Sequence, residues 1–306
     1  MPDKSHDVSK LTIDQSISLE HFKEASYLPN DEILTLGKLA IRLKKPVLIE
    51  GPPGTGKTSL AKAIAKLLKT QLLRIQCFEG ITAEQVIGEF NYQKQLIAIE
   101  LTKHNKDRDD LDEYNIFSKE YFIARPLLSA LQSEVPVVLL FDEIDRADEE
   151  FEAFLLEALG ENQITIPELG TIAASSTPIV FLTSNGTREL SPALRRRSLY
   201  LALDYPDRDR EQQIIRLHVP KIDEELAIKI VDLLRKIRRN ENINQSPSIS
   251  EGIELAQTLL VLGQEYLEMP KLQEILGLLA KNSADMVEIR RMLLVEQDQV
   301  SNSSNQ

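Results

Sequence analysis

The stretch from Gly51 to Thr58 constrains the fold of this 306-residue chain more than any other feature. It reads Gly-Pro-Pro-Gly-Thr-Gly-Lys-Thr and fits the pattern GxxxxGK[ST], between an apolar run (Pro46–Glu50) and an amphipathic stretch (Ser59–Lys69). Glycines let backbone amides turn toward a phosphate chain, and a helix that starts there adds a partial positive charge. A plain Gly/Pro turn is the alternative, but average residue usage gives a chance match in roughly 1% of such chains. The motif therefore predicts a strand, a phosphate-binding loop and a helix in succession.

The loop residues have separate expected roles toward a nucleoside triphosphate. The ammonium group of Lys57 would reach the β- and γ-phosphates, and the hydroxyl of Thr58 would bind Mg²⁺. We expect Asp142 to hold the same metal ion together with Thr58. The predicted nucleotide-binding set is Gly51, Pro52, Pro53, Gly54, Thr55, Gly56, Lys57, Thr58, Ser59 and Asp142.

Two adjacent carboxylates end a second apolar run. Val137–Phe141 is wholly apolar and is followed by Asp142 and Glu143. Because the carboxyl ends of parallel strands meet at one edge of a sheet, we expect this pair to lie beside the phosphate loop. Asp142 would hold Mg²⁺ through water, and Glu143 would polarise an attacking water as a general base. A strand followed by an acidic helix cap is the alternative.

An asparagine and three arginines complete the set of candidates. Asn185 ends another apolar run, where its amide can orient the same water, although Ser-Asn-Gly is also a common turn. Arg195, Arg196 and Arg197 follow a short predicted helix (Pro192–Leu194), and a solvated basic turn is the alternative there. After two carboxylates and an asparagine, we expect Arg196 or Arg197 to supply transition-state charge to a neighbouring subunit.

Short apolar runs alternate with amphipathic stretches over the first two thirds of the chain. This alternation predicts the α/β class, with helices packed on a parallel sheet. One run is almost wholly Val, Leu and Phe, as expected for a parallel strand that is buried on both faces. The predicted strands are Pro46–Glu50, Leu72–Cys77, Val135–Phe141, Pro178–Ser184 and Leu199–Leu203, and the predicted helices include Asp31–Leu43 and Ser59–Lys69.

The pattern changes near Tyr205–Pro206, after which we find helices and no convincing strand. Glu224–Arg239 has apolar residues at helical spacing, and Ser248 with Glu251 forms a capping box that starts another helix. We expect a flexible tail (1–24), a nucleotide-binding α/β domain (25–205), an all-helical domain (206–295) and a second flexible tail (296–306). Within the α/β domain we predict an insert at about 91–121, with a polar middle (Lys103–Asp112), and a hairpin at about 163–177.

Composition excludes several classes of protein. The 36 Lys and Arg against 48 Asp and Glu give a net charge of −12, which argues against a protein that coats nucleic acid. Cys77 is the only cysteine, so we expect neither a disulfide scaffold nor a dedicated zinc site. No run approaches the ~18 apolar residues of a membrane span. Because the N-terminus (Met1–Lys10) also lacks the apolar core of a signal peptide, we expect a cytoplasmic protein.

The order of these motifs resembles the AAA+ ATPases. In that family's terms Gly51–Thr58 is Walker A, Asp142 and Glu143 are Walker B, Asn185 is sensor 1, and Arg196 or Arg197 is the arginine finger. The resemblance implies a parallel-sheet P-loop domain with a C-terminal helical lid, and Mg²⁺-dependent ATP hydrolysis. It also implies a ring oligomer, expected to be a hexamer, in which a neighbour completes each site.

More narrowly, the insert and the hairpin are similar to those of the MoxR branch. Five stretches are similar in sequence to the CoxD-like accessory ATPases: Cys77–Ile81, Asn91–Leu96, Asp142–Leu156, Ile164–Thr171 and Ala193–Arg197. This resemblance implies chaperone-like maturation of a metalloenzyme and a partner protein with a von Willebrand factor A domain. One position departs from the branch, because Ser248 stands where many relatives have the sensor 2 arginine, so no sensor 2 residue is assigned.

Two rival functions stay open on the sequence. A nucleic-acid motor or restriction-type NTPase shares the triple arginine but needs a basic pore stripe, and the insert here is mixed and acidic. The other rival is a nucleotide-binding scaffold that does not hydrolyse, which the presence of both Glu143 and Asn185 disfavours.

Overall fold

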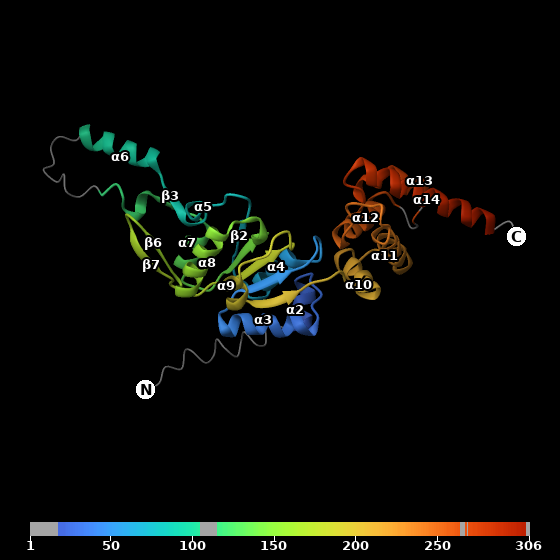
Figure 1. Cartoon of the computed structure of the whole chain (residues 1–306), viewed down its shortest axis with the longest axis horizontal. Helices are drawn as coiled ribbons and strands as arrows, with labels where there is room; N and C mark the ends of the chain where they lie inside the picture. Colours follow the sequence, from blue (N-terminus) through green and yellow to red (C-terminus); the bar gives the residue numbers. More distant parts are fainter. Residues whose placement is uncertain (1–17, 105–114, 264–266, 268, 304–306) are drawn as a thin grey trace. The chain divides into compact units, whose positions relative to one another are not determined.

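The chain forms two compact units in a computed structural model that describes residues 18–104, 115–263, 267 and 269–303 (Figure 1). The first unit comprises residues up to 25, 29–51 and 57–202, and the second comprises 26–28, 52–56 and the chain from 203 onward. Two short early stretches therefore group with the second unit, which a single boundary drawn near Tyr205–Pro206 does not anticipate.

A five-stranded parallel sheet forms the centre of the first unit, in the order β2-β5-β8-β1-β9. Its register pairs Gln76 with Asp142 and Glu50 with Ser184, so the carboxyl ends of four strands meet at one edge. The strands are β1 (Val47–Glu50), β2 (Leu72–Gln76), β5 (Val138–Asp142), β8 (Ile179–Ser184) and β9 (Leu199–Ala202). Every residue of β5 and β8 is buried, as expected for central parallel strands. The predicted fold class is confirmed.

Strand β5 begins at Val138 rather than at Val135, where the apolar run starts. The side chain of Val135 is 63% exposed, and Pro136 has no amide hydrogen to donate to a neighbouring strand. The carbonyl of Pro136 instead accepts a hydrogen bond from the Thr70 hydroxyl at 2.7 Å. The strand extends to include Asp142, so its carboxylate is carried by the sheet itself.

Helix α2 (Leu19–Glu24) lies inside the segment predicted to be a flexible tail. Ser18 caps its N-terminus, Phe22 is fully buried, and the ammonium of Lys66 donates to the carbonyl of Glu24 at 2.8 Å. Such a short helix is not stable alone, so the packing of Phe22 decides that it forms. The tail prediction is therefore wrong for residues 18–24, and residues 1–17 lie outside the described residues.

Three other helices of the first unit lie close to where the sequence predicts them. Helix α4 (Lys57–Leu67) begins directly after the loop, two residues before the predicted start at Ser59. Helix α9 (Pro192–Arg197) contains the three arginines in its last turn, where cations favour the helix dipole, whereas they were predicted to follow the helix. Helix α3 (Asp31–Leu43) has the predicted bounds. The sequence did not predict α5 (Ala83–Ile87), α7 (Pro126–Gln132) or α8 (Glu149–Glu161), nor the short 3₁₀ turns at Lys119–Tyr121 and Ile144–Arg146.

Both predicted interruptions are structured additions to the first unit. Strands β3 (Gly88–Phe90) and β4 (Phe122–Ala124) pair antiparallel and carry helix α6 (Tyr92–His104) between them (Figure 1). Strands β6 (Gln163–Ile166) and β7 (Gly170–Ala173) form the predicted hairpin. The polar middle of the insert, Lys103–Asp112, lies mostly outside the described residues.

The described residues of the second unit contain helices and no strand. The helices are α10 (Arg208–His218), α11 (Glu224–Arg238), α12 (Ile249–Val261), α13 (Met269–Glu274) and α14 (Ser283–Ser303), with a 3₁₀ turn at Leu276–Leu278. The predicted capping box starts α12. Helix α14 runs through most of the predicted C-terminal tail, so residues 296–303 are helical, and 304–306 lie outside the described residues. No helix among the described residues has the length and apolar character needed to cross a membrane.

Candidate nucleotide-binding site

The phosphate loop joins the end of β1 to the start of α4. The amide of Gly51 donates to the carbonyl of Ser184 at 3.2 Å, which fixes the start of the loop on the sheet. Lys57 is the first residue of α4, and its ammonium donates to the carbonyl of Gly51 at 2.7 Å. Burial lowers the pKa of Lys57, and the nearby carboxylates of Asp145, Asp142 and Glu143 act in the opposite direction. The ammonium of Lys57 is thus held against the start of the phosphate loop.

The middle of the loop, Pro52–Gly56, has the backbone that its glycines allow. Gly54 has φ +73° and Gly56 has φ +93°, a region that side chains other than glycine rarely adopt. A Cβ atom on Gly54 would also lie 2.1 Å from the Cβ of Ser248, so a glycine is required there for two reasons. Ser248 is the residue found in place of the sensor 2 arginine, and its hydroxyl contacts Glu251 in the capping box of α12.

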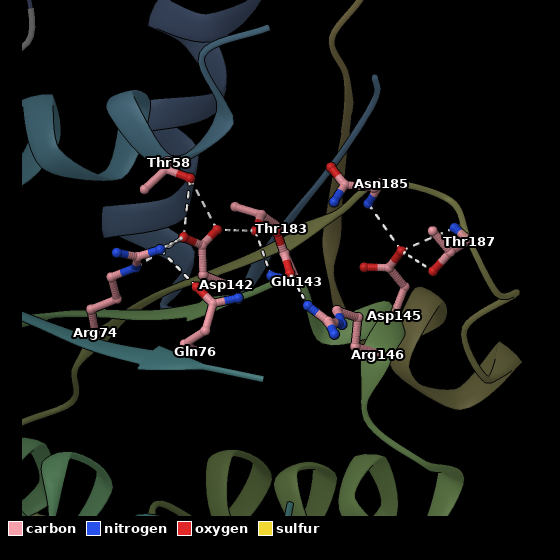
Figure 2. A network of polar contacts seen from close by, with 10 residues as sticks. All are labelled: Thr58, Arg74, Gln76, Asp142, Glu143, Asp145, Arg146, Thr183, Asn185 and Thr187. Carbon is pink, nitrogen blue, oxygen red and sulfur yellow. Dashed lines mark hydrogen bonds and ion pairs between the residues drawn. The ribbon is translucent and has the colours of Figure 1, made fainter. Parts of the chain in front are cut away.

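Asp142 is the centre of the polar network in Figure 2. The hydroxyl of Thr58 lies 3.0 and 3.1 Å from its two carboxylate oxygens, which links the phosphate loop helix to the end of β5. The hydroxyl of Thr183 on β8 donates to Oδ1, and the guanidinium of Arg74 on β2 donates to Oδ2. Three elements that are distant in sequence therefore fix one buried carboxylate.

The residues at this edge fit Mg²⁺. Thr58 and Asp142 provide hard oxygen donors in contact with each other, which is the donor type that this ion prefers. No group of three or more His, Cys, Asp or Glu in the described part of the chain is arranged as a complete metal cage. Mg²⁺ is usually held by one or two protein oxygens together with phosphates and water.

Glu143 follows Asp142 in a left-handed conformation, with φ +57° and ψ +50°. Its amide donates to the hydroxyl of Thr183 at 2.9 Å, and its Oε2 accepts from Arg146 at 3.1 Å. The side chain is about one third exposed, unlike the buried Asp142. The turn therefore directs one carboxylate into the protein and leaves the next accessible, as the two predicted roles require.

Asn185 lies beyond the end of β8, at the same edge as the two carboxylates (Figure 2). Its backbone amide donates to Asp145 Oδ2 at 3.1 Å, and Thr187 donates to the same oxygen through its backbone amide at 3.0 Å and its hydroxyl at 2.7 Å. The other oxygen of Asp145 is buried and has no hydrogen-bond partner among the described residues. Asp145 thus fixes the loop that carries Asn185.

Sequence reasoning missed Arg74, Thr183, Asp145 and Thr187. Asp145 lies in the run Asp-Glu-Ile-Asp, and its proximity to two recognised carboxylates was the available signal. Thr183 looks like an ordinary strand residue in the sequence, and its contact with Asp142 forms only because β8 lies next to β5.

The three arginines of α9 have different surroundings. Arg195 forms an ion pair with Glu50 at 2.8 Å, which holds it to the end of β1. Arg197 donates to the carbonyl of Leu156 at 3.2 Å, and Arg196 makes no hydrogen bond or ion pair within the part of the chain that is described. Both Arg196 and Arg197 are exposed, so either can reach a group outside this subunit.

Comparison with known families agrees with this geometry. A model described as "AAA domain (dynein-related subfamily)" matches residues 46–198, which is half of the chain and includes every candidate residue named above except Ser248. The chain belongs to this family. The match covers the sheet edge, the phosphate loop and the arginines of this AAA domain, and it ends before the helices of the second unit.

Two relatives illustrate the similarity. The gas vesicle ATPase GvpN of Haloferax mediterranei is 28% identical over 213 residues, which covers 65% of this chain and 58% of that protein. GvpN1 of Halobacterium salinarum is 27% identical over 212 residues, with the same two coverages. The chain therefore spans less than two thirds of the length of these relatives.

A solved structure of a RuvB mutant from Thermotoga maritima shares the fold of the AAA protein. Its TM-score is 0.51 at 21% identity, and the match covers 85% of this chain and 72% of that one. This similarity supports the RuvB-like P-loop fold and the helical C-terminal region.

Proposed function

We propose that this AAA protein binds ATP with Mg²⁺ and hydrolyses it by attack of water on the γ-phosphate. The contact between the Thr58 hydroxyl and both oxygens of Asp142 carries the proposal. It joins the two motifs that the chemistry needs, the phosphate loop and the carboxylate strand, while Lys57 lies at the start of the same helix.

The chain's own groups have distinct tasks in this proposal. Bound Mg²⁺ would neutralise charge on the β- and γ-phosphate oxygens. The loop amides and Lys57 hold the phosphates, and Glu143 accepts a proton from the water. Arg146 contacts Oε2 of Glu143, so the proposal assigns Oε1 to that proton. The side-chain amide of Asn185, on a loop fixed by Asp145, orients the water.

Nucleotide binding is the first test. Lys57→Ala should lose the binding of a fluorescent ATP analogue, because Lys57 is the one lysine of the loop motif, and the other lysines of α4 lie further along the helix. Lys62→Ala is the matched control, since Lys62 is an exposed lysine of the same helix, and it should bind as the wild type does. Equal affinity in the Lys57→Ala variant and the wild type would contradict the proposed site.

We further propose that the active form is a ring, expected to be a hexamer, in which Arg196 or Arg197 completes a neighbour's site. Their exposure on the last turn of α9 supports this assignment. An arginine supplied from a neighbour typically accelerates phosphoryl transfer ~10³-fold or more. Specific activity should therefore rise with protein concentration as the ring assembles.

Mixing two inactive variants tests the arginine role. Arg196→Ala or Arg197→Ala mixed with Lys57→Ala should regain activity, because a wild-type loop then meets a wild-type arginine. Arg188 pairs with the buried Glu152 and is unsuitable as a control. Arg125, an exposed arginine at the start of α7, serves instead, and Arg125→Ala should not regain activity with Lys57→Ala beyond its own wild-type level. Turnover that is independent of concentration and unchanged by both arginine substitutions would contradict the ring.

The sequence resemblance supports a proposal for the cellular role. We propose that the chain is a cytoplasmic ATPase of the MoxR type, which remodels or matures a metalloenzyme together with a von Willebrand factor A-domain protein. The sequence similarity to CoxD-like ATPases around Cys77, Asp142 and Ile164 supports this role. The relatives described above are named as gas vesicle ATPases. A tagged Glu143→Gln variant should capture the A-domain partner when ATP is present, and capture of nucleic acid instead would favour the motor alternative.

A further inference from the structure

Arg74 contacts the carboxylate that is expected to serve Mg²⁺. It lies on β2, the strand next to β5, and its Nε and Nη2 are 2.9 and 2.6 Å from Oδ2 of Asp142. Nη2 also donates to Oε1 of Gln76 at 2.7 Å, which holds the guanidinium against the sheet (Figure 2). The arginine is about half exposed, whereas Asp142 is buried.

With Arg74 in this position both oxygens of Asp142 are fully engaged. Oδ1 accepts from Thr58 and Thr183, and Oδ2 accepts from Arg74 and at longer range from Thr58. A guanidinium beside a carboxylate lowers its attraction for a further cation, because the two positive charges repel and compete for one oxygen. The sequence gives no hint of this, since Arg74 reads as an ordinary polar position of a strand.

We propose that Arg74 weakens metal binding at Asp142 in the nucleotide-free protein, so that Mg²⁺ enters the site with the phosphates and not before them. The inference rests on the proposed function, because it assigns Asp142 to the metal. Phosphate oxygens would add strong anionic ligands for such an ion, so the arginine matters least when nucleotide is bound. Arg74 acts through Asp142 and is therefore a positioning residue.

Metal affinity without turnover tests this directly. Mn²⁺, which is paramagnetic and has similar ligand preferences, can be titrated into the full chain while the free ion is measured by electron paramagnetic resonance. Without nucleotide, Arg74→Gln should bind Mn²⁺ about tenfold more tightly than the wild type, the effect of losing one partly screened unit charge near the ion. Arg74→Lys, which keeps the charge, should remain within about threefold of the wild type.

Two controls separate the possible failures. Arg125→Gln removes an equally exposed arginine from an ion pair with Glu89, and it should leave Mn²⁺ affinity unchanged. With ADP present, the wild type and Arg74→Gln should bind Mn²⁺ within about threefold of each other. Unchanged or weaker nucleotide-free binding in Arg74→Gln, with normal binding in ADP, would overturn the role of Arg74 alone. Absence of Mn²⁺ binding in ADP for every protein would instead overturn the proposed function.

Discussion

Replacing Thr183 with valine removes one hydroxyl that contacts both the carboxylate of Asp142 and the backbone amide of Glu143. The hydroxyl donates to Asp142 Oδ1 and accepts from the amide of Glu143 at 2.9 Å, and the side chain is only 1% exposed. Valine has nearly the same shape but can make neither bond. The variant therefore leaves the Glu143 amide without its acceptor and removes one of the donors to Asp142.

The expected loss of stability follows from these two bonds. A polar group left without its partner costs about 1–3 kcal/mol of stability, which applies in full to the Glu143 amide. Asp142 loses less because it keeps its contacts with Thr58 and Arg74, so we expect the free energy of unfolding to fall by about 2–3 kcal/mol in total. Thr183→Ser keeps the hydroxyl and loses one buried methyl group, which costs about 1 kcal/mol. Turnover should fall about tenfold in Thr183→Val, because Glu143 loses the bond that places it, and should stay near the wild-type rate in Thr183→Ser.

Urea denaturation followed by far-UV circular dichroism measures the stability difference, and phosphate release measures turnover. The comparison is valid if the slope of the unfolding free energy with urea is the same for each variant. The reasoning is refuted if the valine and serine variants are equally stable and equally active, since the hydroxyl would then hold neither Asp142 nor Glu143.

Three further predictions concern neighbouring groups. Asp145→Ala should lower the free energy of unfolding by about 2–4 kcal/mol, and Asp145→Asn by less, because asparagine keeps an oxygen for the backbone amides of Asn185 and Thr187. Urea unfolding measures both losses, and equal losses would contradict the prediction. Gly54→Ala should abolish binding of the ATP analogue, because the new Cβ would lie 2.1 Å from Ser248. Gly80 has φ +80° and nothing within 4 Å of a built Cβ, so Gly80→Ala should bind the analogue normally and lose only about 1–2 kcal/mol of stability. Burial raises the pKa of the Cys77 thiol to about 12, so iodoacetamide at pH 8.5 should label it only after unfolding, as mass spectrometry would show. The pKa of this thiol is higher in the folded protein than its ordinary value near 9 in the unfolded chain. Its contribution to stability is therefore fully present below pH 9 and is lost as the pH rises toward 12.

Much of the site could be predicted because its motifs are local in sequence. The phosphate loop specifies its own strand and helix, and a run that ends in Asp142 and Glu143 places both at the carboxyl edge of a parallel sheet. The alternation of apolar runs with amphipathic stretches was enough for the α/β class. These signals depend on short-range periodicity, which a single sequence contains.

The rest depends on which strands become neighbours. Arg74 and Thr183 reach Asp142 only because β2 and β8 flank β5, an order that no local pattern of the sequence specifies. Helix α2 forms because Phe22 is buried against other elements, so its own six residues did not predict it. Strand β5 starts late because Pro136 follows an exposed Val135, where an apolar run alone suggests a longer strand.

Turnover by Glu143→Gln tests the central claim most directly. Steady-state phosphate release should fall by ~10² or more, the contribution of a general base, while the affinity for the ATP analogue stays at the wild-type value because the loop and Asp142 are unchanged. Glu150→Gln, an exposed acid on α8, is the matched control and should hydrolyse ATP at the wild-type rate. Hydrolysis by Glu143→Gln at the wild-type rate would contradict the assignment of this edge of the sheet as an ATPase site.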